Sequence, residues 1–355
     1  MKSGITLQQL ASEIHRQQAT KRDILASTGK LFHATDEQGT TRIEVEGPDQ
    51  HLHQFPTTEL FRRQVADRLG VPWQYFERLR TDHPALLDEN VNQLFRREPA
   101  ERMVRTLDGR ARAFLSHKYR RLDNGSILEA VYPYLASIAG LQFESLALTD
   151  SKMYLKVVTP EFKFEMQPGD VVQAGAVISN SEVGLGSMSV QRLIFRCRCS
   201  NGLIVPDAGY RKTHIGRVNG VSDDGLTVYS DETLEAEEKA FFLKARDTIM
   251  SALSEATFVM AAQKMQRTIG MRITGNPTKA VEVLATRFLL NEAESNGVLS
   301  SLMGDQMFTA YGLVNAVTDV SKSVESYDRA TELETIGGRM VEMKDSDWES
   351  VLTAM

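Results

Sequence analysis

Residues 141–199 have the sequence LQFESLALTDSKMYLKVVTPEFKFEMQPGDVVQAGAVISNSEVGLGSMSVQRLIFRCRC. Five segments within it are rich in the aliphatic, β-branched and aromatic residues that favour strands: LQFESLALT, KMYLKVVT, EFKFEM, DVVQAGAVIS and SMSVQRLIFRCRC. The breaks between them lie at Asp150-Ser151, Pro160, Pro168-Gly169 and residues 180–186. Because these connections are short, consecutive strands must pair antiparallel. The stretch therefore predicts an α+β fold, with an antiparallel sheet of about five to seven strands backed by helices.

Helical patterns flank the predicted sheet. On its amino-terminal side we expect helices over residues 6–19, 57–69, 72–80 and 84–97, with polar loop material leading up to His53. Gly70 suits the end of one helix and Pro72 the first turn of the next, so these two helices form a hairpin. The second helix offers few short polar side chains for base edges, which favours an ordinary helical hairpin over a DNA-reading helix-turn-helix.

The carboxy-terminal third has a different character from the rest. After a helix over residues 126–140, which Asp123 can cap, and after the sheet, helices are predicted at residues 232–266, 279–290, 304–320 and 325–334. Many of the 14 methionines lie there. We therefore expect three regions: an N-terminal helical region (1–95), an antiparallel α+β core with basic strands (96–230), and an acidic, methionine-rich helical region (231–355).

Composition and charge limit the classes of protein. The 355 residues carry a net charge of −6, and no apolar run is long enough to span a membrane. The amino-terminal sequence is polar and amphipathic, unlike a secretory signal peptide. Cys197 and Cys199 lie two residues apart on a predicted strand, so they face opposite sides and cannot easily bridge, which indicates a reducing, cytoplasmic compartment. Residues 221–355 carry −10 and residues 1–220 carry +4, so the amino-terminal part is the one that suits an anion.

The segment from Arg96 to Arg121 is locally basic, with a net charge of +6. Asp108-Gly109 is a preferred type I′ turn, and the flanking residues alternate as strands do. This alternation places Arg102 or Arg105, and Arg110 or Arg112, on exposed positions, with Val104, Ala113 and Leu115 inside. Tyr119 follows, and its ring could stack on a base. Its neighbours in the sequence are cationic: Lys118, Arg120 and Arg121. The alternative is a solvated hairpin with ordinary surface arginines.

A second basic group lies on the last predicted strand and the residues after it. Arg192, Arg196 and Arg198 share parity, so all three should lie on one face, where they could follow a phosphate backbone. Arg211 and Lys212 follow shortly after. The alternative is an arginine ladder partnered by acidic residues on neighbouring strands.

Patterns that indicate catalysis or a cofactor are missing from the sequence. It contains no P-loop, nucleophile elbow, HExxH or paired-cysteine zinc pattern, so no cofactor or metal is expected. His117 could act as a base, but no motif pairs it with a nucleophile. Residues 184–189, GLGSMS, could form an anion-binding nest, but the sequence favours a hairpin turn or bulge there.

Three segments resemble a known family. FLSHKYRRLDN (114–124), FRCRCSNGL (195–203), and AYGLVNAVTDVS (310–321) followed by DRATELETIGG (328–338) resemble blocks of a phage/plasmid-like protein family that is catalogued as a domain of unknown function. The resemblance covers roughly residues 55–340 and includes the helical region RLGVPWQYFERL. The family pattern has one cysteine before SNGL where this chain has two. The resemblance implies a protein of a mobile element in a bacterial cytoplasm, without implying an activity.

These observations favour a non-enzymatic nucleic-acid-binding protein of a phage or plasmid. Single-stranded DNA is the favoured partner, bound or annealed in replication or recombination, and the protein could assemble as a homo-oligomer. The candidate contact residues are Arg105, Arg110, Arg112, Lys118, Tyr119, Arg120, Arg121, Arg192, Arg196, Arg198, Arg211 and Lys212. Two alternatives stay open: a module that binds a host or phage protein through the acidic helices, and an enzyme whose site no motif reveals.

Overall fold

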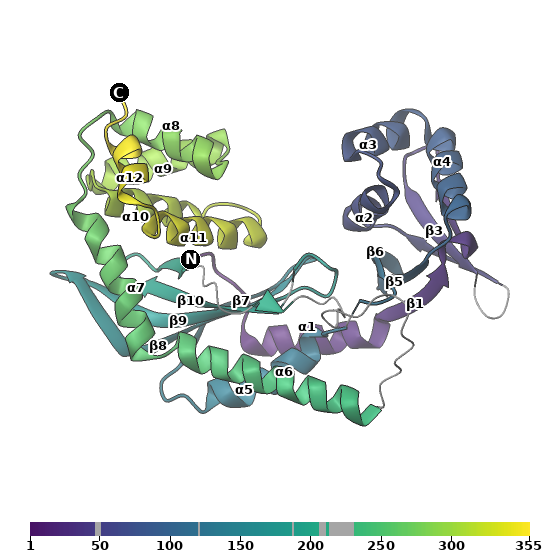
Figure 1. Cartoon of the computed structure of the whole chain (residues 1–355), viewed down its shortest axis with the longest axis horizontal. Helices are drawn as coiled ribbons and strands as arrows, with labels where there is room; N and C mark the ends of the chain where they lie inside the picture. The colour runs from purple at the N-terminus through teal and green to yellow at the C-terminus, as the bar shows by residue number, and fades with distance from the viewer. Residues whose placement is uncertain (47–50, 120, 187, 206–210, 213–230) are drawn as a thin grey trace.

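The structure is a computed structural model that describes residues 1–46, 51–119, 121–186, 188–205, 211–212 and 231–355. It is an α+β protein with antiparallel sheets, which confirms the predicted class. Figure 1 shows two lobes. We call the described residues between 22 and 119 the N-terminal lobe and the other described residues, built around the largest sheet, the sheet lobe.

The largest sheet has the strand order β11-β10-β9-β8-β7, and β12 pairs with β10. Its strands are β7 (Gln142–Leu148), β8 (Met153–Gln167), β9 (Asp170–Asn180), β10 (Met188–Arg196), β11 (Asn201–Val205) and β12 (Arg211–Lys212). The predicted break at Pro160 is wrong, because β8 continues through this residue. The register between β8 and β9 shifts between Thr159 and Lys163. Such a bulge accepts proline, which has no N–H to donate to a neighbouring strand.

Both faces of this sheet are covered. One face packs against α1 (Leu7–Thr20), α5 (Asn124–Ala136) and α6 (Asp231–Ala252), and the other packs against α11 (Tyr327–Val341). Figure 1 shows α11 on the opposite side of the sheet from α5 and α6. Alternate residues of β8 illustrate this, since Leu155 joins the core beneath the sheet while Tyr154 packs with Tyr327 above it. Strands buried on both faces lose the polar–apolar alternation from which exposure is predicted.

The carboxy-terminal helices belong to the sheet lobe. After α6 they are α7 (Glu255–Arg267), α8 (Pro277–Phe288), α9 (Glu292–Asp305), α10 (Ala310–Val320), α11 and α12 (Asp345–Leu352). The predicted continuous helix at 232–266 is wrong, because Ser254 stands at the N-cap position of α7 and separates it from α6. The sequence analysis placed no helix between residues 290 and 304 and so missed α9, although Asn291 and Glu294 form a capping box at its start.

The N-terminal lobe contains more β structure than the sequence indicated. Its elements are β1 (Arg22–Ser27), β2 (Leu31–Thr35), β3 (Thr41–Glu46), β4 (Leu52–Pro56), α2 (Glu59–Leu69), α3 (Trp73–Asp82), α4 (Pro84–Arg97), β5 (Glu101–Leu107) and β6 (Arg110–Ser116). The helical hairpin is confirmed, with Gly70 at φ 68° ending α2. The predicted loop before His53 is wrong. Strands β2, β3 and β4 form a small sheet there, and β3 alternates buried Ile43 and Val45 with polar residues.

The basic hairpin has the predicted turn. Asp108 and Gly109 have φ angles of 51° and 73°, as a type I′ turn requires. Strand β5 also pairs with β1, in the order β1-β5-β6. The hairpin therefore belongs to the N-terminal lobe, and not to a core that begins at residue 96.

A buried ion pair holds α11 against the sheet. Lys156 Nζ lies 2.6 Å from Glu334 Oε2, and both side chains are completely buried. The ammonium also lies 4.7 Å from the centre of the Tyr327 ring. Burial lowers the pKa of Lys156, while the charge of Glu334 and its hydrogen bond oppose that shift.

Replacing one partner of this pair should destabilise the protein strongly. For Glu334→Gln we expect a loss of about 3–5 kcal/mol in the free energy of unfolding, because a buried ammonium loses its counter-charge. The double variant Lys156→Met/Glu334→Leu should recover most of that loss. Urea denaturation measures both, and Lys163→Met on the exposed part of β8 is the control. A Glu334→Gln variant as stable as the control would contradict this account.

Candidate ligand-binding groove

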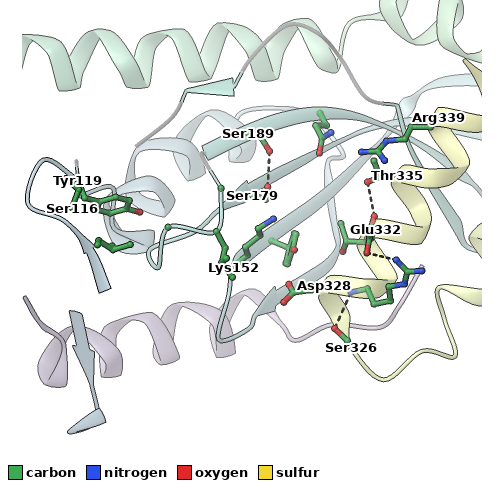
Figure 2. Close-up of a pocket in the computed structure, with 18 of the residues that line it drawn as sticks. Ser116, Tyr119, Lys152, Ser179, Ser189, Ser326, Asp328, Glu332, Thr335 and Arg339 are labelled. Atoms are coloured by element: carbon green, nitrogen blue, oxygen red, sulfur yellow. Dashed lines mark hydrogen bonds and ion pairs between the residues drawn. The ribbon is translucent and has the colours of Figure 1, made fainter. Parts of the chain in front are cut away.

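The two lobes meet at an open cavity of about 960 Å³. Figure 2 shows Ser116 and Tyr119 on one side of it, α11 on the other, and Lys152, Ser179 and Ser189 of the sheet region between them. The contributions of α11 include Asp328, Glu332, Thr335 and Arg339. Arg68 of α2 and Lys118 add cations from the N-terminal lobe.

A second cavity of about 450 Å³ adjoins the first. Arg63, Arg110, Arg112 and Glu182 are among its lining residues, and Lys152 and Leu185 line both cavities. We call the two cavities together the interlobe groove. It passes on both sides of the turn that bears Leu185.

The groove has an excess of positive groups without counter-charges. No carboxylate among the described residues lies within ion-pair distance of Arg68, Arg110, Lys152 or Arg339. Beside the groove, partial burial lowers the pKa of Arg102, and the charge of Arg68 lowers it further.

Most carboxylates that line the groove are neutralised by arginines. Glu59 pairs with Arg63, Asp108 with Arg16, Glu182 with Arg112, and Glu332 with Arg329. Asp328 accepts a hydrogen bond from Thr149 at 3.1 Å. Asp150 and Asp328 are the lining carboxylates that no cation of the described chain pairs with. An anionic ligand would therefore meet an attractive field.

Arg105 was one of two arginines that strand parity offered as exposed, and it was a candidate contact residue; the structure contradicts both for Arg105. Its side chain is fully buried: Nε lies 2.7 Å from Asp23, Nη2 lies 2.9 Å from Asp123, and Nη1 donates to the Glu182 carbonyl at 2.8 Å. Burial alone would lower the pKa of Arg105, but the two carboxylates raise it above its ordinary value. Parity places Arg105 on the opposite face of β5 from Val104, but residues 182–183 cover that face too, so neither face of the strand is exposed there.

The other candidates of the hairpin region have different positions. Arg110 is exposed and lines the groove, whereas Arg112 lines it with its charge paired to Glu182. Lys118 is exposed and lines the larger cavity. Arg121 is exposed, lies 3.4 Å from Asp23 and does not line the groove. Arg120 lies outside the described residues.

Tyr119 lines the groove but packs as an anchor. Its ring lies against the cluster that contains Met103, Leu115 and Val183, and its hydroxyl donates to the Ser181 carbonyl at 3.0 Å. Burial raises the pKa of this hydroxyl. These contacts describe an aromatic anchor at the edge of the groove and not the free stacking platform that was predicted.

The arginines of β10 do not line the groove. Arg196 is buried, and its Nε and Nη2 atoms donate to the two carboxylate oxygens of Asp170 at 2.6 and 2.7 Å. Arg192 donates to the Thr257 carbonyl of α7 at 3.4 Å. Arg198 is exposed in the turn after β10, so it does not continue the strand and its predicted parity is wrong. The groove side of β10 presents Ser189 and Gln191 instead. The backbones of Arg211 and Lys212 pair with β10 beside the groove, and their side chains lie outside the described part of the chain.

The sequence missed several residues of the groove. Arg63, Arg68, Lys152 and Arg339 were not predicted, because they come from separate elements that only the tertiary fold brings together. His117 is exposed, and neither cavity includes it, so the groove offers no support for it as a catalytic base.

Two further structural findings and the comparisons with known proteins bear on the site. Within the described residues, no cluster of His, Cys, Asp or Glu is arranged to hold a metal ion. No helix in that part of the chain is long and apolar enough to cross a membrane. No protein-family model matches the chain, and searches of curated proteins and of solved structures find no match.

The different roles of Arg105 and Arg110 should appear in protein stability. Arg105→Ala removes the buried counter-charge of Asp23 and Asp123, so we expect the free energy of unfolding to fall by about 3–5 kcal/mol. Arg110→Ala, on the same hairpin but exposed, should change it by less than about 0.5 kcal/mol. Urea denaturation compares the two variants. Equal stabilities would mean that Arg105 is not part of a buried ion cluster.

Proposed function

We propose that the protein binds nucleic acid in the interlobe groove, with single-stranded DNA as the favoured form. The observation that supports this is the convergence of cations without carboxylate partners on one groove: Arg68, Arg110, Lys152 and Arg339. Phosphate groups are the densest regular source of negative charge that such a groove would meet, and binding them releases condensed counterions.

The remaining polar lining suits a sugar–phosphate backbone. Ser116, Ser179, Ser189 and Thr335 place hydroxyl groups along the larger cavity. Hydroxyls and amides of this kind commonly hydrogen-bond to phosphate oxygens, which fixes the position of a strand without reading its sequence. We therefore propose binding that depends little on base sequence.

We propose a biological setting from the resemblance to the phage/plasmid-like family. Two of the resembling segments, residues 114–124 and 328–338, contribute Tyr119 and Asp328 to opposite sides of the groove. The third, which contains Arg196 and Arg198, lies away from it. In this proposal the protein acts in a bacterial cytoplasm on DNA of a phage or plasmid, during replication or recombination, and assembles as a homo-oligomer along the strand.

A second candidate function is binding of a protein partner. Helices α6, α7 and α9 expose Met250, Met260 and Met303, and flexible methionines suit adaptable protein surfaces. In that case nucleic-acid affinity would be incidental and would not depend on the groove.

Binding to a labelled single-stranded oligonucleotide should weaken steeply with salt. For about four phosphate contacts, the slope of log K against log salt should be about −3. Arg68→Ala/Arg339→Ala should reduce the magnitude of that slope to about 1.5, because two contacts are lost. The matched control is Arg198→Ala/Arg272→Ala, which removes two exposed arginines that do not line the groove. Fluorescence anisotropy measures all three proteins.

Two results would contradict the proposal. One is a slope near zero for the unaltered protein. The other is an equal loss in the groove variant and the control variant, which would mean that the arginines act through total charge and not through the groove.

A further inference from the structure

Leu185 is an unusual residue within the interlobe groove. It is 42% exposed, and it lines both cavities. The other large apolar side chains that line the groove, including Leu115 and Tyr154, are buried or half-buried. Among the large apolar side chains that line the groove, Leu185 is therefore the exposed one.

The turn that bears Leu185 is held in place from both lobes. Ser181 Oγ accepts the N–H groups of Val183 and Leu185, at 3.3 and 3.1 Å. Gln64 of α2 donates to the Val183 carbonyl at 2.7 Å. Because these contacts fix the backbone before any ligand arrives, little ordering is needed when Leu185 makes a contact.

The flanking glycines let the turn approach its neighbours closely. Gly184 has φ 79°, and a Cβ there would lie 2.6 Å from Leu115 Cδ2. Gly186 has φ 144°, and a Cβ there would lie 3.7 Å from Lys152 Nζ. The turn that bears Leu185 thus lies close to Leu115 of the N-terminal lobe at Gly184 and close to Lys152 at Gly186.

We infer that Leu185 is a contact for an unstacked nucleobase. The inference rests on the proposed function and goes further, because it names the part of the ligand that this residue meets. Arg110 lines one cavity, Arg339 lines the other, and Leu185 lines both, so a strand whose phosphates bind cations of both cavities would lie along Leu185. An apolar side chain that inserts between the bases of a duplex must unstack them, at a cost of about a few kcal/mol, whereas the bases of a single strand are already accessible. The residue therefore favours single strands over duplex.

The test uses the full chain with single-stranded and duplex oligonucleotides that contain 2-aminopurine, whose emission rises when it leaves a base stack. The unaltered protein should raise the emission of the single strand. Leu185→Ala should abolish that rise and weaken single-strand binding about tenfold, with a much smaller effect on duplex. Leu185→Met should keep both properties, because its side chain is of similar size and also apolar.

Leu86→Ala is the matched control, since Leu86 is 44% exposed on α4 and lies outside the groove. Unchanged single-strand affinity and emission in Leu185→Ala would overturn the inference and leave groove binding intact. An equal loss for single strand and duplex would also overturn it. If the unaltered protein binds neither oligonucleotide, the proposed function fails, and the inference fails with it.

Discussion

The structure depends on one buried carboxylate, Glu182, which joins the two lobes. Its side chain, 4% exposed, lies 3.2 Å from Lys21 and pairs with Arg112, and it accepts the backbone N–H of Asn124 at 2.7 Å. Its backbone carbonyl accepts a hydrogen bond from Arg105. Burial alone would raise the pKa of Glu182, but these cations and the Asn124 N–H lower it below its ordinary value. A charge this deeply buried is tolerated only with such a set of partners.

The groove follows from this junction and from a second buried pair. Residues on both sides of Glu182 also contact the N-terminal lobe, since Ser181 accepts from Tyr119 and Val183 accepts from Gln64. These contacts fix the turn that divides the groove. On the opposite wall, Lys156 and Glu334 hold α11 against the sheet. Arg105, which was predicted to bind a ligand, is buried at this junction and has a structural role instead. The cations that line the groove are exposed side chains of neighbouring elements.

The local structure could be predicted from the sequence where the determinants are local. The turn at Asp108-Gly109, the end of α2 at Gly70 and the antiparallel pairing all follow from residue preferences within a few positions. The exposure of the arginines could not be predicted in this way. Arg105 is separated from Asp23 by 82 residues and from Glu182 by 77, and Arg196 from Asp170 by 26. Strand parity assigned these arginines to solvent, but other segments of the chain cover the sheet at both positions. Residues 182–183 cover Arg105, and Tyr311 of α10 covers Arg196.

Hydrogen–deuterium exchange with and without a single-stranded oligonucleotide tests most directly whether the interlobe groove is the binding surface. The account predicts slower exchange at the end of β6, around Lys152, at the turn that bears Leu185 and along the groove side of α11. It predicts no change in the turn at residues 197–200, which follows the arginines of β10. Protection of that turn with unchanged exchange around the groove would contradict the account, and it would return the binding surface to the arginine-bearing end of β10.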